Sequence, residues 1–216
     1  MAFNRIGYGQ VEPNQLSGIK TGQIYASLPL DKKVEVLQNG EFMFYDYANN
    51  MVVADPADSV DGEIVMTEPY LVYNEVKIYE DWLSYKDFAM IRVGNNYVTN
   101  PKAVGRVTSA NADGTVYGGG ALTEDAEIEH GDLQGGYRMD GIAPRLVKTN
   151  VGDIFTTNMV KTGVEYNVGT ILSPVLNSTT HTLQLEESSA GPIKFVVVKV
   201  YTMPDGQDGL KIQRIA

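Results

Sequence analysis

The sequence repeats itself at a distance of about 130 residues, and this repeat constrains the fold more than any other feature. Residues 19–25 read IKTGQIY and residues 147–155 read VKTNVGDIF, so Gly22 and Gly152 stand 130 positions apart. With short gaps the matches keep their order: Val34 with Val164, Gly40 with Gly169, Gly62 with Gly191, residues 76–79 with 198–201, Met90 with Ile212, and Arg92 with Arg214. Such a pattern predicts one structural unit used twice, at residues 20–93 and 150–216.

Short runs of alternating polar and apolar residues, separated by turn signals, predict strands along most of the chain. Residues 33–37 and 41–45 alternate in this way on either side of Gln38-Asn39-Gly40, so they predict a hairpin. The 22 glycines and 13 tyrosines also favour turn-rich β structure. We therefore expect an all-β fold of two similar barrel or sandwich modules, because closing a sheet hides the edge strands that otherwise aggregate.

Two stretches lie outside the expected modules. Residues 1–19 contain several Gly, Pro, Asn and Ser breakers and predict an extended N-terminal arm. Within it we expect Phe3, Arg5 and Tyr8 to contact a partner, since aromatic and arginine side chains are common anchors at interfaces. The alternative is a coil folded back on its own domain. Residues 94–149 are crowded with glycine and predict a loop-rich insertion or linker.

Charge and composition exclude several classes of partner. The formal net charge is -10, which opposes binding to nucleic acid and to anionic membrane surfaces. The chain has no cysteine, so disulfides and thiolate chemistry are excluded. Its first residues carry no apolar segment typical of a signal peptide, and no apolar run is long enough to span a bilayer. We expect a protein made in the cytoplasm without a standard secretion signal.

No residue pattern indicates an enzyme. His130 and His181 stand in an acidic loop and a Ser/Thr-rich turn, and no Gly-x-Ser-x-Gly elbow occurs. The densest acidic cluster, residues 124–132, offers oxygen ligands to a hard cation but lacks the EF-hand pattern, so a solvated loop is the default interpretation. The Gly run at 118–120 lacks the Lys-Ser/Thr of a phosphate-binding loop. We expect no catalytic residue, no cofactor and no metal.

Aromatic residues leave a sugar-binding surface open as an alternative. At strand spacing such residues more often pack within a sheet than on its surface. The aromatic residues concerned are Tyr45, Tyr47, Tyr73, Tyr79, Trp82 and Tyr85.

Three segments resemble the head proteins of tailed bacteriophages, and the capsid decoration, or cement, proteins most of all. They are residues 1–14 (MAFNRIGYGQVEPN), 151–158 (VGDIFTTN) and 200–207 (VYTMPDGQ). The resemblance implies a β-rich protein of the virion that binds the outer surface of the head, bridges neighbouring capsomers and acts as a homo-oligomer, often a trimer. Its partner would be the major capsid protein. A head fibre base or tail protein, and a carbohydrate-binding module for host attachment, are the alternatives.

Overall fold

The computed structural model describes residues 2–5, 9–55, 68–74, 89–93, 96–99, 137–139, 143–203 and 206–216, and only the backbone of 89–93, 96–99 and 137–139. Within these residues it contains fifteen strands and one short helix, so the expected all-β class is confirmed. The elements are β1 (Val11–Gln15), α1 (Ser17–Lys20), β2 (Ile24–Tyr25), β3 (Val36–Gln38), β4 (Phe42–Asp46), β5 (Met51–Val53), β6 (Tyr70–Val72), β7 (Ala89–Val93), β8 (Asn96–Thr99), β9 (Tyr137–Met139), β10 (Leu146–Val147), β11 (Ile154–Thr157), β12 (Ile171–Asn177), β13 (Thr182–Glu187), β14 (Phe195–Thr202) and β15 (Asp208–Arg214).

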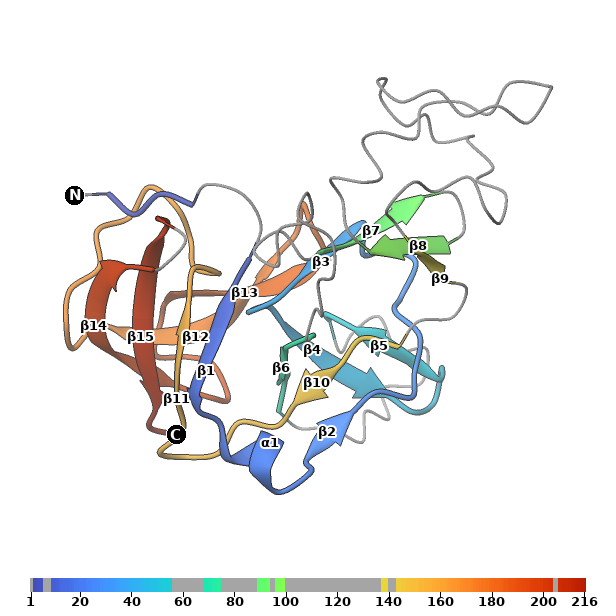
Figure 1. Cartoon of the computed structure of the whole chain (residues 1–216), viewed down its shortest axis with the longest axis horizontal. Coiled ribbons are helices and arrows are strands. Elements are labelled where there is room, and N and C mark those ends of the chain that lie inside the picture. The colour runs from blue at the N-terminus through green and yellow to red at the C-terminus, as the bar shows by residue number, and fades with distance from the viewer. Residues whose placement is uncertain are drawn as a thin grey trace.

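One sheet of eleven strands carries most of the structure. Its order is β1-β11-β15-β14-β12-β13-β4-β6-β10-β2, with β5 beside β4. A separate sheet of four strands has the order β3-β7-β8-β9. Figure 1 shows β11, β12, β14 and β15 at one side of the molecule, and β2, β4, β6 and β10 at the other. The two groups meet where β13 pairs with β4, at Leu183 and Phe42.

The two halves of this sheet, called its two sides below, have equivalent strand orders. One half has the order β2-β10-β6-β4-β5, and the other has the order β11-β15-β14-β12-β13. Their registers also correspond. On β4 and β6, Phe42 lies opposite Leu71, and on β12 and β14, Ile171 lies opposite Val196. The loops before β4 and β12 match as well, because Gly40 N donates to Val72 O and Gly169 N donates to Val197 O, at 2.9 and 2.8 Å.

The outer strands of each side correspond in the same way. Leu146 on β10 lies opposite Tyr25 and Val72, and Ile212 on β15 lies opposite Phe155 and Val197. The strand that matches β15 is therefore β10, which lies inside the expected connecting region 94–149.

This pairing differs from the alignment read off the sequence. Residues 76–79 and Gly62 lie outside the described residues. Residues 90–92 belong to β7, which pairs with β3 and β8 in the smaller sheet, whereas their expected counterparts lie on β15. The strand that corresponds to Phe195–Val197 is Tyr70–Val72. The sequence alignment, which matched residues 198–201 with 76–79 on their Val and Tyr residues, is therefore shifted by three residues from the structural correspondence.

The hairpins β4–β5 and β12–β13 also turn alike. Asp46 Oδ1 accepts the N–H groups of Ala48 and Asn49, and Asn177 Oδ1 accepts those of Thr179 and Thr180. Each loop then ends on the same backbone conformation, since the two non-glycine residues with positive φ among the described residues are Asn50 (54°) and His181 (49°). Asp and Asn favour such loops because their side chains bond the backbone two residues on.

A single hydrophobic core joins the two sides of the sheet. Phe195 on β14 packs against Phe155 of β11 and against Phe42 of β4, with ring centroids 5.5 and 5.6 Å apart. All three side chains are fully buried. Aromatic contacts of this kind contribute stabilisation beyond that of the area they bury. The two sides therefore do not stand apart as independent units.

Candidate functional site

The N-terminal segment lies along the C-terminal side of the large sheet (Figure 1). Phe3 N donates to Val164 O at 2.8 Å, and Gly163 N donates to Phe3 O at 2.9 Å. The Phe3 ring meets Tyr166 edge-on, with centroids 5.9 Å apart, and only 5% of Phe3 is exposed. Phe3, one of the three residues expected to contact a partner, thus belongs to the core of its own chain in this conformation.

Arg5 also contacts its own chain. Its side chain is part-buried, and Nη1 contacts the sulfur of Met159. The guanidinium acts electrostatically on the buried carboxyl group of Glu41, while burial lowers the pKa of Arg5 itself. Tyr8, the third expected partner contact, lies outside the described residues. The structure thus brings Phe3 and Arg5 onto one segment but assigns neither a partner.

Glu41 is the most unusual ionisable residue in the described part of the chain. It stands directly before β4 and is 1% exposed. Oε2 accepts the N–H of Gln38 at 2.9 Å, and Oε1 accepts the hydroxyl of Thr182 at 3.1 Å. Burial raises the pKa of Glu41 to about 8, although both hydrogen bonds and the charge of Arg5 act to lower it. The group therefore changes charge near neutral pH.

Two glycines allow close packing around the turn at residues 38–41, which carries Glu41. Gly9 N donates to Gln38 Oε1 at 2.7 Å, and a Cβ at Gly9 would overlap Asn39 O and the Met159 side chain. Gly40 has φ +93°, and a Cβ there would overlap the hydroxyl of Thr157. These close approaches require glycine. We call the N-terminal segment (residues 2–5 and 9–10), the turn at residues 38–41 and residues 157–159 together the seam.

Buried amide side chains complete the seam. Gln10 N donates to Asn158 Oδ1 at 2.6 Å, and Asn158 Nδ2 donates to Gln207 Oε1 at 3.0 Å. The Thr157 hydroxyl donates to Gln10 O at 2.8 Å. Among the described residues, Gln10 Nε2 is buried without a partner. The set ties the start of β1 to the end of β11 and to the loop between β14 and β15.

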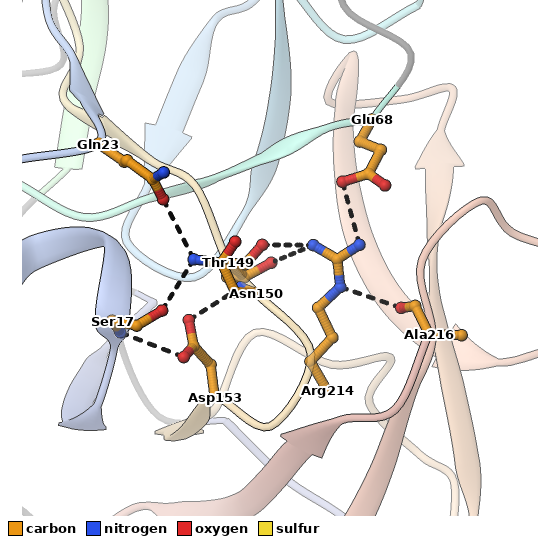
Figure 2. Close-up of polar contacts among 8 residues, drawn as sticks. All are labelled: Ser17, Gln23, Glu68, Thr149, Asn150, Asp153, Arg214 and Ala216. Carbon is orange, nitrogen blue, oxygen red and sulfur yellow. Dashed lines mark hydrogen bonds and ion pairs between the residues drawn. The ribbon is translucent and has the colours of Figure 1, made fainter. Parts of the chain in front are cut away.

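A second polar junction, shown in Figure 2, fixes the turn between β10 and β11. Asn150 Nδ2 donates to Ser17 Oγ at 2.8 Å and to Gln23 Oε1 at 3.1 Å, while Asp153 accepts the backbone N–H groups of Ser17 and Asn150. The start of α1 and the residue before β2 are thus tied to the turn before β11 by neutral donors and one carboxylate.

Arg214 forms the other half of this junction (Figure 2). Its Nη2 lies 3.0 Å from Glu68 Oε2, its Nε donates to Ala216 O at 3.0 Å, and its Nη1 contacts both oxygens of Thr149. The side chain is almost fully buried, so its charge is stabilised by these four acceptors. The junction has the character of a structural tie between chain segments.

Four tyrosines gather near β2 and β4. Tyr25 lies between Tyr45 and Tyr70, with ring centroids 5.4 and 4.9 Å apart, and Tyr47 packs on Tyr45 at 5.6 Å. Tyr45 is fully buried and its hydroxyl accepts the N–H of Ser27 at 2.8 Å. Tyr47 is 42% exposed. Of the six aromatic residues singled out in the sequence, Tyr47 is exposed, Tyr73 is half-buried and Tyr45 is buried, while Tyr79, Trp82 and Tyr85 lie outside the described residues.

The remaining candidates from the sequence are placed as follows. His181 occupies the last position of the β12–β13 loop, and His130, residues 124–132 and the Gly run at 118–120 lie outside the described residues. Among the described residues no group of His, Asp and Glu is arranged to hold a metal ion. No helix in the same residues is long and apolar enough to cross a membrane.

Sequence reasoning missed Glu41, Asn158 and Arg214 as buried polar residues. A glutamate that follows a turn and begins an alternating run is ordinarily assigned to solvent, and Glu41 has that place. In its buried place Glu41 accepts a hydrogen bond from Thr182, a residue 141 positions away, and no local sequence pattern contains such a contact.

Comparison of the chain with protein-family models, with curated proteins and with solved structures found no match.

Proposed function

We propose that this chain is a non-enzymatic structural component of a virus particle, a decoration protein that binds the outer surface of a tailed-phage head and stabilises it. The proposal is carried by the resemblance of three segments, residues 1–14, 151–158 and 200–207, to phage head proteins. The all-β fold agrees with it, because such proteins are β-rich.

The positions of the three segments support this proposal. They are far apart in the sequence, yet β1 pairs with β11, and the Tyr201 hydroxyl donates to Glu12 at 2.6 Å. Asn158 joins the same set through Gln10 and Gln207. The described residues of the three segments therefore contact one another on one side of the sheet, as expected if the segments descend together from one functional unit.

We further propose that the two sides of the large sheet are barrel modules that arose by duplication. The equal strand orders and registers support this. Two isolated parallel bridges at corresponding places also support this: Leu30 with Val52, and Val160 with Leu185. The first brings the chain after β2 beside β5, and the second brings the chain after β11 beside β13. A bridge of this kind closes a sheet on itself.

The partner in this proposal is the major capsid protein, and the chain acts as a homo-oligomer, with a trimer as the expected state. The place of action is the head surface of the virion. The acidic balance of the chain supports an outer position, away from the packaged DNA, which also makes nucleic acid and anionic membranes poor partners.

The test is co-sedimentation of the purified protein with DNA-filled and empty heads of the phage that encodes it. Saturable binding across the whole head lattice is the expected result, and the copy number gives the symmetry of the binding site. Unlabelled protein in excess serves as the control for specific binding. Binding only to one vertex or to the tail would assign the chain to a fibre base or a tail, and no binding to any particle would overturn the virion proposal.

A carbohydrate-binding role is the second candidate, and the exposed ring of Tyr47 above the tyrosine cluster is the observation that favours it. An exposed aromatic face offers an apolar platform to the C–H face of a sugar ring. Saturable binding on a glycan array that Tyr47→Ala abolishes would support this role. Equal glycan binding by the variant, or none by the parent, would remove it.

A further inference from the structure

The outer half of β14 has an unoccupied edge in the described part of the chain. β12 pairs with β14 at Phe195 and Val196, and the residues just before β12 extend this pairing to Val197, where Gly169 N donates to Val197 O and Val197 N donates to Thr170 O. Beyond this point β14 continues to Thr202 and pairs with β15 alone. A strand edge of this kind presents backbone N–H and C=O groups that another extended chain can pair with.

The side chains on this part of β14 differ between the two faces of the sheet. Val200 lies opposite the buried Leu210 but is itself 43% exposed, and Val198, at the bulge, is 42% exposed. Lys199 lies on the other face, directly opposite Lys211. The edge thus has an apolar side and a basic side.

The Lys199–Lys211 pair is unfavourable as it stands. Like charges directly opposite each other on neighbouring strands destabilise a sheet. Neither lysine forms an ion pair with a carboxylate among the described residues, and Lys199 instead lies over the Tyr201 ring, 5.1 Å from its centroid. These two lysines face each other in a chain of net charge -10.

A row of residues crosses the sheet at this level. Glu12 lies opposite Thr156, Thr156 opposite Lys211, and Lys211 opposite Lys199. A strand added beside β14 would extend this row by one residue, opposite Lys199. An acidic residue at that place would offset the two positive charges.

We propose that the Val198–Thr202 edge of β14 binds an extended, acidic segment of a partner protein as an additional strand. The side-chain alternation of strands defines the pattern of that segment. Its central residue, opposite Lys199, is Asp or Glu, and the residues on either side are apolar and cover Val198 and Val200. This surface does not depend on the virion proposal, since its charge and open edge are the same whichever partner supplies the segment.

The experiment uses the full chain and two capped seven-residue peptides of alternating valine and a charged residue, one with Glu and one with Lys. Binding is measured by NMR titration of backbone amides. The Glu peptide is expected to shift and protect the amides of residues 198–202, and the Lys peptide is not. The variant Lys199→Glu is expected to weaken binding of the Glu peptide by about five- to tenfold and to bind the Lys peptide instead.

Lys20→Glu is the matched control, because Lys20 is an exposed lysine on α1, away from β14. It should leave the affinity for the Glu peptide unchanged. The proposal is overturned if the Glu peptide causes no shifts at 198–202, or if Lys199→Glu and Lys20→Glu affect binding equally. A concentration-dependent shift at 198–202 without peptide would instead show a second copy of the chain at this edge, and would also overturn it.

Discussion

Glu41 Oε1 accepts a hydrogen bond of 3.1 Å from the hydroxyl of Thr182, a residue 141 positions further along the chain. This contact lies beside the pairing of Phe42 with Leu183, where the two sides of the large sheet meet. A titratable group is therefore buried at the place on which the continuity of the sheet depends. Its ionisation couples the stability of the molecule to pH.

Stability should fall as the pH rises toward 8. The pKa of Glu41 is raised to about 8 in the folded state, from an ordinary value of 4.5, so the folded chain holds a proton that the unfolded chain releases. The contribution of Glu41 is full below pH 4.5, is lost at up to about 1.4 kcal/mol per pH unit, and levels off above pH 8. Denaturant unfolding at pH 5.5, 7.0 and 8.5 measures it.

Glu41→Gln should remove this part of the pH dependence, because an amide does not titrate. Glu35→Gln is the control, since Glu35 is exposed. It should keep the pH dependence of the parent. A Glu41→Gln variant with the parent's slope between pH 5.5 and 8.5 would show that another group is responsible.

Phe3→Ala should lower the free energy of unfolding by about 3 kcal/mol, because it leaves a cavity between Tyr166 and Val164. Asn4→Ala should change it by less than about 0.5 kcal/mol, since Asn4 is exposed and contributes only its backbone N–H to Asp208. Thermal unfolding followed by circular dichroism compares the two. Equal stability of both variants would mean that Phe3 is not held in the core in solution and is available as a partner contact.

Gly40→Ala should destabilise the protein by more than Gly169→Ala. Both glycines have φ +93°, so both substitutions carry the same backbone strain, of about 1 kcal/mol or more. Only at Gly40 does a Cβ meet Thr157 and Met159; at Gly169 nothing lies within 4 Å. The difference between the two unfolding free energies isolates the close approach of Gly40 to Thr157 and Met159, and no difference would mean that these residues lie further from Gly40 in solution.

Arg214→Ala should cost about 3 kcal/mol, because the carboxylate of Glu68 and the oxygens of Thr149 lose a buried donor. Gln213→Ala, one residue earlier on β15, should have a small effect, since its single side-chain hydrogen bond is long, at 3.5 Å. Chemical denaturation of the pair checks this. Similar losses for both would indicate that the Figure 2 junction contributes little to stability.

The sequence predicted what depends on local pattern. The alternation at 33–37 and 41–45 predicted β structure, and the matched glycines at 40 and 169 do precede corresponding strands. The hairpin predicted from these two stretches is wrong, because β3 pairs with β7 in the smaller sheet, whereas β4 pairs with β5, β6 and β13. Strand pairing between distant segments could not be predicted from the sequence. Leu146 and Val147 pair with β6 and β2 across a gap of more than 70 residues, and two residues are too few to show periodicity. The arm appeared extended from its breakers, but its contacts with Val164 and Asn158 are long-range.

The most direct test of the proposed role is electron cryo-microscopy of purified virions of the phage that encodes the chain, beside heads assembled without it. The account predicts an additional β-rich density at every equivalent position of the outer head lattice in the virions, absent from the heads without the chain. Identical head surfaces in the two samples would contradict the central claim.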